Sequence, residues 1–171
     1  FDGTDVGIAR SIFHLGDTNT SIGFDAADNI EFITGASERL RINSAGNLEQ
    51  TLSVDAQGFK QTNANNHYIY NIIDANRSAA NDHLLIQQGR WNGKNVAAMK
   101  FKAGDDTGNK DDGYITFETS SANNQKEKLR IQSNGFIGIN TTNASKLVTI
   151  KADAPYVRLE AQDGSDKRLD F

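Results

Sequence analysis

The sequence predicts an all-β fold, and three observations lead to this prediction. Apolar residues recur at every second position in short runs, as they do in strands with one inward face. Small polar residues separate these runs at intervals of roughly 8–12 residues, the spacing of strands joined by tight turns. One motif also occurs twice, each time after a strand-like run. We therefore expect short-strand modules that repeat along the chain.

The expected strands follow one another in order, and each is defined by two or three apolar residues that alternate with polar ones. Such runs are typical of strands that bury a single face. The inward residues are Val6 and Ile8; Ile22 and Phe24; Ile30 and Phe32; Leu40 and Ile42; Leu52 and Val54; Tyr68, Tyr70 and Ile72; Met99 and Phe101; Ile115 and Phe117; Leu129 and Ile131; Ile137 and Ile139; Val148 and Ile150; Val157 and Leu159.

One range favours another conformation. Residues 74–88 contain several alanines, and Asp74 is a suitable helix N-cap, but the Asn and Ser content of the range opposes a long helix. We expect one helical turn or an excursion loop there.

The repeated motif begins with charged residues and ends in a turn. Glu38–Leu48 reads Glu-Arg-Leu-Arg-Ile-Asn-Ser-Ala-Gly-Asn-Leu, and Glu127–Ile137 reads Glu-Lys-Leu-Arg-Ile-Gln-Ser-Asn-Gly-Phe-Ile. Each copy follows an apolar run, Ile30–Thr34 or Ile115–Thr119, and the second copy has four more residues in between. Because loops tolerate insertions and strands do not, this pattern indicates a repeated structural unit. The adjacent Asn and Gly in each copy tolerate positive φ and predict a hairpin turn.

The composition limits the classes of function. The chain has 171 residues, 37% of them hydrophobic, and a formal net charge of −4. It has no long basic run of the kind that forms a nucleic-acid-binding face, and its apolar runs fall short of the ~18 residues that a membrane span needs. It contains no cysteine, which excludes disulfides and thiolate metal sites. We expect no nucleic-acid partner and no membrane insertion.

The expected strands are too short to stabilise a single chain. Each offers about two inward side chains, worth roughly 1.5–3 kcal/mol apiece when buried, against a backbone ordering cost of roughly 1–2 kcal/mol per residue. Three chains around one shared core would bury the same residues from three sides. We therefore expect an obligate homotrimer, whose core candidates are Leu40, Ile42, Ile115, Phe117, Leu129, Ile131, Ile137 and Ile139.

Both copies of the motif resemble repeats in tail-fibre and related virion proteins of marine phages, including phages of cyanobacteria. The similarity lies in Glu38–Asn47 and in Glu127–Thr142, where Glu-Arg-Leu-Arg-Ile or a variant precedes a polar turn with Gly and the second copy continues into Ile-Gly-Ile. Residues 14–20 and 104–113 also resemble segments of these proteins. The resemblance implies a homotrimeric fibre of intertwined β structure, located in the virion as part of a tail fibre.

The chain departs from the usual pattern of these proteins at two places. The first copy has Leu48–Thr51 in place of a Gly-Ile-Gly step, and the second has Asn140 and Ala144 where Gly and Pro are usual. Pro155–Leu159 resembles the first strand of a following module. We therefore expect a first β module in 1–55, a second with a longer insertion in 56–150, and the start of a third, truncated module in 151–171.

The densest group of acidic residues is Asp105, Asp106, Asp111 and Asp112. A calcium loop of the EF-hand type requires Gly at its sixth position, where a loop that starts at Asp105 has Lys110. The turn is therefore either a solvated loop or an ion site of another type.

The sequence carries no recognisable catalytic motif. Its histidines, His14, His67 and His83, lack the spacing of zinc ligands, and no Gly-x-Ser-x-Gly elbow accompanies them. Glycan cleavage would require two carboxylates at a fixed separation, and no pair here lies in a distinctive setting such as an aromatic-rich cleft. We therefore assign no catalytic residue, cofactor or metal ligand.

Basic residues alternate in the second copy of the motif, at Lys126, Lys128 and Arg130. Regular alternation would place them on one strand face and Glu127 on the opposite face with Leu129. We expect the basic face either to be solvated, which would oppose edge-to-edge pairing, or to form ion pairs with the acidic turns of another chain.

Three aromatic residues are candidates for contact with a glycan. Trp91 lies in a turn between Gly89 and Gly93, and Tyr68 and Tyr70 alternate in an expected strand. The ring of each residue has an apolar face that can stack on a sugar, and a polar group that can form a hydrogen bond to it. Alternatively, Trp91 fills a local core beneath a loop.

Together these observations predict a non-enzymatic structural segment of a virion tail fibre that supports or carries out attachment to the host cell. Its expected partners are further copies of itself, other tail or virion proteins, and host surface polysaccharide. Two alternatives stay open: a tailspike-type polysaccharide depolymerase, and a cellular surface adhesin built from the same repeat.

Overall fold

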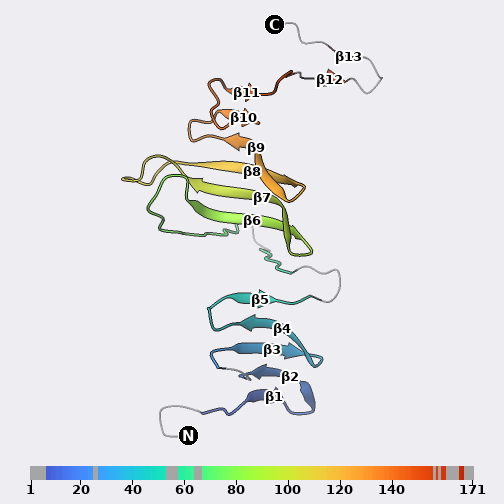
Figure 1. The fold of residues 1–171 in the computed structure, drawn as a ribbon. Helices are drawn as coiled ribbons and strands as arrows, with labels where there is room; N and C mark the ends of the chain where they lie inside the picture. The colour runs from blue at the N-terminus through green and yellow to red at the C-terminus, as the bar shows by residue number, and fades with distance from the viewer. Residues whose placement is uncertain are drawn as a thin grey trace. The chain divides into compact units, whose positions relative to one another are not determined.

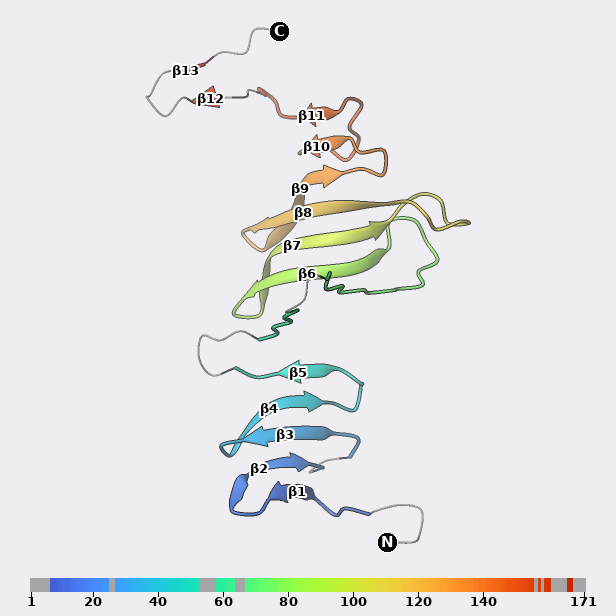
Figure 2. The same cartoon turned by 180° about the vertical axis from the view of Figure 1, so that it is seen from behind.

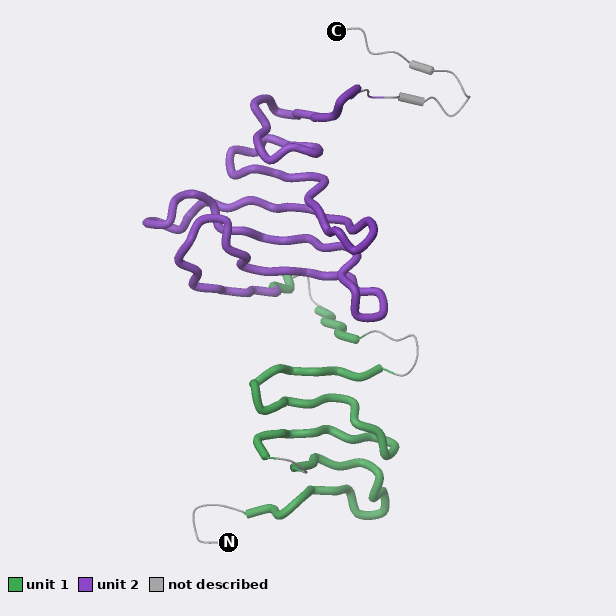
Figure 3. Tube along the Cα trace, viewed as in Figure 1, with its two compact units in different colours: residues 1–70 green, residues 71–171 purple. Residues whose placement is uncertain are grey.

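The computed structural model describes residues 7–24, 27–52, 58–63, 67–155, 157, 159–160 and 166–167. The chain divides into two compact units, Phe1–Tyr70 and Asn71–Phe171 (Figure 3). Strands and loops make up the described residues, without a helix, and the predicted all-β class of short strands is confirmed. The division after Tyr70 falls within the range 56–150 predicted as the second module, and the module boundaries stay predictions.

Unit 1 is a five-stranded antiparallel sheet in which each strand pairs with the next one along the chain. Figure 1 shows its strands lying side by side in one layer. The sheet contains β1 (Ser11–His14), β2 (Asp17–Gly23), β3 (Ile30–Thr34), β4 (Ser37–Ile42) and β5 (Leu48–Gln50).

Unit 2 contains a six-stranded sheet with the same neighbour-to-neighbour order. Its pairings are antiparallel except the last, in which β10 and β11 run parallel, and Figure 2 shows the layer from behind. The strands are β6 (His83–Trp91), β7 (Lys94–Ala103), β8 (Gly113–Ser121), β9 (Asn124–Ile131), β10 (Ile137–Ile139) and β11 (Val148–Ile150). A separate pair, β12 (Leu159–Glu160) and β13 (Asp166–Lys167), follows.

The two copies of the motif pair with their preceding strands in the same register. In unit 1, β3 aligns Phe32 with Leu40, and in unit 2, β8 aligns Phe117 with Leu129. A β-bulge follows immediately in both pairs, so that Arg39 in β4 and Lys128 in β9 have no partner opposite them. The inserted residues therefore lengthen the hairpin without changing the register of its apolar positions.

The turns also correspond. Gly46 and Gly135 both have positive φ, of 79° and 82°, and their amides donate to the carbonyl oxygens of Asn43 and Gln132 at 2.8 and 2.9 Å. Glycine adopts this backbone conformation without a steric cost, which explains its place in both copies. The hairpin predicted from each Asn and Gly pair is present between β4 and β5 and between β9 and β10.

Some strand predictions are wrong. Described residues 67–82 form no strand, although Tyr68, Tyr70 and Ile72 alternate as strand residues would. Conversely, β6 begins at His83, inside the range 74–88 predicted to be a helical turn or a loop. As an edge strand with one neighbour, β6 accommodates polar residues and a glycine that obscure its periodicity. Val6 and Val54, also predicted as strand residues, lie outside the described residues.

A single chain has almost no enclosed core in the part that the structure describes. The buried apolar residues there are Ala98 and Ala144, and the large apolar side chains of both sheets are half-buried or exposed. This finding follows from the architecture, because a one-layer sheet leaves each of its faces without a second layer to pack against.

Candidate functional site

Most large apolar side chains of each sheet share one face, which we call its apolar face, whereas Phe13, Ile33 and Ile86 lie on the opposite face. In unit 2, pairing places Ile115 opposite Ile131 and Ile131 opposite Ile137, and Phe117 and Leu129 form the adjacent row. The remaining members of the two rows are Leu85, Met99, Phe101, Ile139, Val148 and Ile150.

The apolar face of unit 1 has the same construction on a smaller scale. Ile12, Ile22, Phe32 and Leu40 form one row across β1 to β4. A second row contains Ile30, Ile42 and Leu48. All eight residues predicted as the trimer core therefore lie on these two apolar faces, and their role in a trimer stays a prediction.

The large side chains of these faces keep much of their surface in contact with solvent. Phe32 is 37% exposed and Phe117 is 40% exposed. Fully burying a side chain of this size contributes roughly 1.5–3 kcal/mol, so each still has about 1 kcal/mol to gain from a covering surface. Both apolar faces can thus act as association surfaces.

The opposite face of each sheet, its polar face, is the better covered of the two. Glu31 is 4% exposed, and Thr116, which occupies the corresponding position in unit 2, is 0% exposed. Long charged side chains lie along this face and shield their neighbours from solvent. The polar faces thus hold the most deeply buried side chains of the two sheets.

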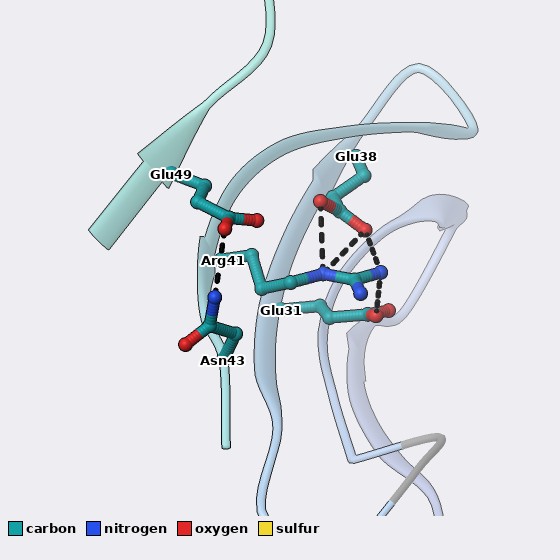
Figure 4. A network of polar contacts seen from close by, with 5 residues as sticks. All are labelled: Glu31, Glu38, Arg41, Asn43 and Glu49. Atoms are coloured by element: carbon teal, nitrogen blue, oxygen red, sulfur yellow. Dashed lines mark hydrogen bonds and ion pairs between the residues drawn. The ribbon is translucent and has the colours of Figure 1, made fainter. Parts of the chain in front are cut away.

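An ion-pair network covers the polar face of unit 1 (Figure 4). The Arg41 guanidinium donates through Nε to both Glu38 carboxylate oxygens, at 3.1 and 3.2 Å, and through Nη2 to Glu31 Oε1 at 2.5 Å. Beside it, Asn43 Nδ2 donates to Glu49 Oε1 at 2.7 Å. These bonds link β3, β4 and β5 across the sheet.

In unit 2 the equivalent arginine has the equivalent partner. Arg130 Nε and Nη2 donate to the two carboxylate oxygens of Glu127 at 2.8 and 2.9 Å, and the hydrogen bond to Glu127 raises the pKa of Arg130. The Arg130 guanidinium also lies over the ring of Tyr114, with Cζ 4.3 Å from the ring centroid. Lys100 and Glu118 form a further, largely buried pair at 2.7 Å.

The prediction that Glu127 lies on the face opposite Arg130 is therefore wrong. The bulge at Lys128 shifts the alternation by one residue and brings Glu127 onto the polar face. Arg130 is ion-paired within its own chain, which replaces the two predicted alternatives for this residue, a solvated position or a pair with another chain.

The acidic turn between β7 and β8 is organised by its own backbone. The Asp112 carboxylate accepts from the amides of Asp105 and Asp106 at 3.1 Å, and Asp106 accepts from Gly108 and Asn109. The hydrogen bonds from Asn109 lower the pKa of Asp106. Throughout the described ranges, no group of three or more His, Asp or Glu side chains is placed to hold a metal ion.

His83 begins β6, near basic side chains of β7. Partial burial, and then the charges of Lys100 and Lys102, lower its pKa, while Glu118 opposes this effect. The pKa of His83 is therefore lowered first by desolvation and second by the basic side chains on β7.

The predicted glycan-contact residues are exposed. Trp91 is 79% exposed at the end of β6, which contradicts the alternative in which it fills a local core. The rings of Tyr68 and Tyr70 lie 6.2 Å apart at 52°. The two tyrosines belong to unit 1 and Trp91 to unit 2, and a glycan-binding role for these residues stays a prediction.

Comparison with known proteins adds no family assignment. A scan against protein-family models and a search of curated proteins found no match to this chain. Because its described residues form strands and loops, they include no helix long and apolar enough to cross a membrane.

Proposed function

We propose that this chain is a non-enzymatic structural segment of a virion tail fibre, in which three copies associate through their apolar faces. The observation that carries the proposal is the contrast between the two faces of each sheet. Ion pairs cover the polar face within one chain, whereas Phe32 and Phe117 on the apolar faces keep about two fifths of their surface exposed. Three sheets around a common axis would cover these rows and leave the polar faces outside.

The correspondence between the two units supports a modular fibre. Equal register, an equally placed bulge and an equivalent Arg–Glu pair recur in β3–β4 and β8–β9. A unit that exposes the same apolar rows each time can associate at successive levels along one axis. In such a fibre, the segment holds a host-attachment region away from the particle, or itself contacts host surface polysaccharide in three copies that reinforce one another.

Solution molar mass tests the assembly. Light scattering should give the purified chain a molar mass of three times its monomer mass of 18.7 kDa. This molar mass should hold at every concentration at which the chain stays folded. A folded monomer would overturn the proposal, and a stable dimer would show that two sheets suffice to cover the apolar faces. Immunogold labelling of virions that carry this protein would test its location, with label along the fibres as the expected result.

A further inference from the structure

A polar cavity of about 370 Å³ opens on unit 2, beside the polar face of its sheet. It lies where β8 begins and β9 ends, between the acidic turn and the loop after β10. Ten of its twelve lining residues have polar side chains, and all twelve belong to unit 2. Small-molecule sites in proteins begin at roughly 300 Å³, so the cavity has room for a small ligand.

One wall of the cavity is fixed in place before any ligand binds. The Tyr114 hydroxyl is 2.5 Å from Asn81 Oδ1 and donates to it, and the Arg130 guanidinium lies over the Tyr114 ring. Glu127 holds Arg130 with two hydrogen bonds. A wall whose side chains are already ordered loses little conformational entropy on binding.

Gln132, which also lines the cavity, is held by a hydrogen bond to the loop after β10. Gln132 Nε2 donates to the carbonyl oxygen of Thr142 at 3.2 Å, while the buried Gln132 Oε1 has no hydrogen-bond partner within the protein. Leaving such a group unpaired costs roughly 1–3 kcal/mol. Because this oxygen is buried, the polar surface that Gln132 offers to the cavity comes from the rest of its side chain.

The charges of the lining select among ligands. The guanidinium of Arg130 is already paired with Glu127, and Asp105 and Asp112 add negative charge to the rim, which disfavours anions. Amides and hydroxyls provide most of the remaining lining, which suits a ligand that donates and accepts hydrogen bonds at many positions. These lining residues are Asn81, Gln132, Ser133, Asn134, Thr142 and Asn143.

We propose that this cavity binds a neutral sugar residue. The proposal deepens the attachment role proposed above and rests on it for the source of the sugar, a host surface polysaccharide. The proposed sugar site is formed by a single chain, so a trimer would carry three copies of the site.

Two substitutions test the site, and the repeated motif supplies a control. Ser133→Tyr should fill the cavity, and Gln132→Leu should replace a polar lining side chain with an apolar one of similar size. Ser44→Tyr places the same side chain at the equivalent turn position of unit 1. Saturation-transfer NMR with the methyl glycosides of glucose, galactose, mannose and N-acetylglucosamine would measure binding, with glucuronic acid as the anionic comparison.

We expect binding of at least one neutral glycoside at millimolar concentration, loss of it in Ser133→Tyr, and weakening of about tenfold in Gln132→Leu. Ser44→Tyr should bind as the unaltered chain does. Binding that persists in Ser133→Tyr, binding of glucuronic acid alone, or no binding of any neutral glycoside would overturn the proposal. Light scattering on the same samples reports assembly separately, so failure of the sugar site and failure of the trimer are distinguishable.

Discussion

Glu38 and Arg41 lie on the same face of β4, although residues three apart in a regular strand face opposite ways. The bulge at Arg39 accounts for this arrangement, because it inserts one residue between them and reverses the alternation. Glu127 and Arg130 are related in the same way through the bulge at Lys128. In both units, therefore, the bulge creates the ion pair that covers the polar face.

The two ion pairs should differ in importance. Glu127→Gln removes the carboxylate that holds Arg130, whereas after Glu38→Gln the Arg41 guanidinium still has its ion pair with Glu31. Because the Arg130 side chain is largely buried, we expect Glu127→Gln to lower the free energy of unfolding by about 1–3 kcal/mol and Glu38→Gln by less than about 1 kcal/mol. Urea unfolding of both variants measures this difference, and equal losses would contradict it.

Charge on the apolar face should prevent assembly. Phe117→Asp places a carboxylate in the row that the proposed trimer buries, where desolvation opposes association. We expect the molar mass to fall to that of a monomer. Leu15→Asp is the control, since this exposed residue lies in the turn between β1 and β2 and should leave the molar mass unchanged. An intact trimer of Phe117→Asp would place the interface elsewhere.

Thr116→Val should stabilise the protein. The Thr116 hydroxyl is fully buried and has no hydrogen-bond partner, and valine has nearly the same shape without the polar group. Removing an unpaired buried hydroxyl should raise the free energy of unfolding by about 1 kcal/mol. The same change at the exposed Thr119 should have an effect within about 0.5 kcal/mol. Destabilisation of Thr116→Val in thermal unfolding would mean that the hydroxyl is hydrogen-bonded in solution.

Gly138 should not tolerate a side chain. A Cβ atom there would lie 2.5 Å from the carbonyl oxygen of Thr141, which is backbone and cannot move aside as a side chain does. We expect Gly138→Ala to cost about 1–3 kcal/mol of unfolding free energy. Gly89→Ala is the matched control, because its nearest neighbour would be the Ala97 carbonyl oxygen at 3.8 Å. Similar denaturation midpoints for the two variants would refute the expected collision.

Acid should weaken the fold through His83. Partial burial and the charges of Lys100 and Lys102 lower the pKa of His83 in the folded state, so the unfolded state binds the proton more readily. This contribution to stability is complete above about pH 6.5, the usual pKa of histidine, and declines as the pH falls through the lowered folded pKa. His83→Gln should remove that part of the decline in urea unfolding measured from pH 7.5 to about pH 5. An unchanged pH dependence would exclude His83 as its source.

The sequence by itself determined the strands that alternate strongly and the turns between them. Phe32 and Leu40, like Phe117 and Leu129, are the apolar residues that a two-residue period identifies, and pairing aligns them as the repeated motif suggests. The prediction failed for β6, whose polar positions and glycine follow from its place at a sheet edge. The prediction of a strand at Tyr68 and Tyr70 also failed, because a strand needs a neighbouring strand to pair with, and alternation of residues does not supply one.

The tertiary structure alone decided which side chains meet. The bulges at Arg39 and Lys128 are invisible to a pattern of fixed period, yet they reverse the face on which Glu38 and Glu127 lie. The polar cavity likewise joins residues from Asn81 to Ala144, because strand pairing brings distant turns to one end of a sheet. A sequence pattern records the preference of each residue for a face, whereas register and bulges arise from hydrogen bonds between strands, and these exist only once the strands are paired.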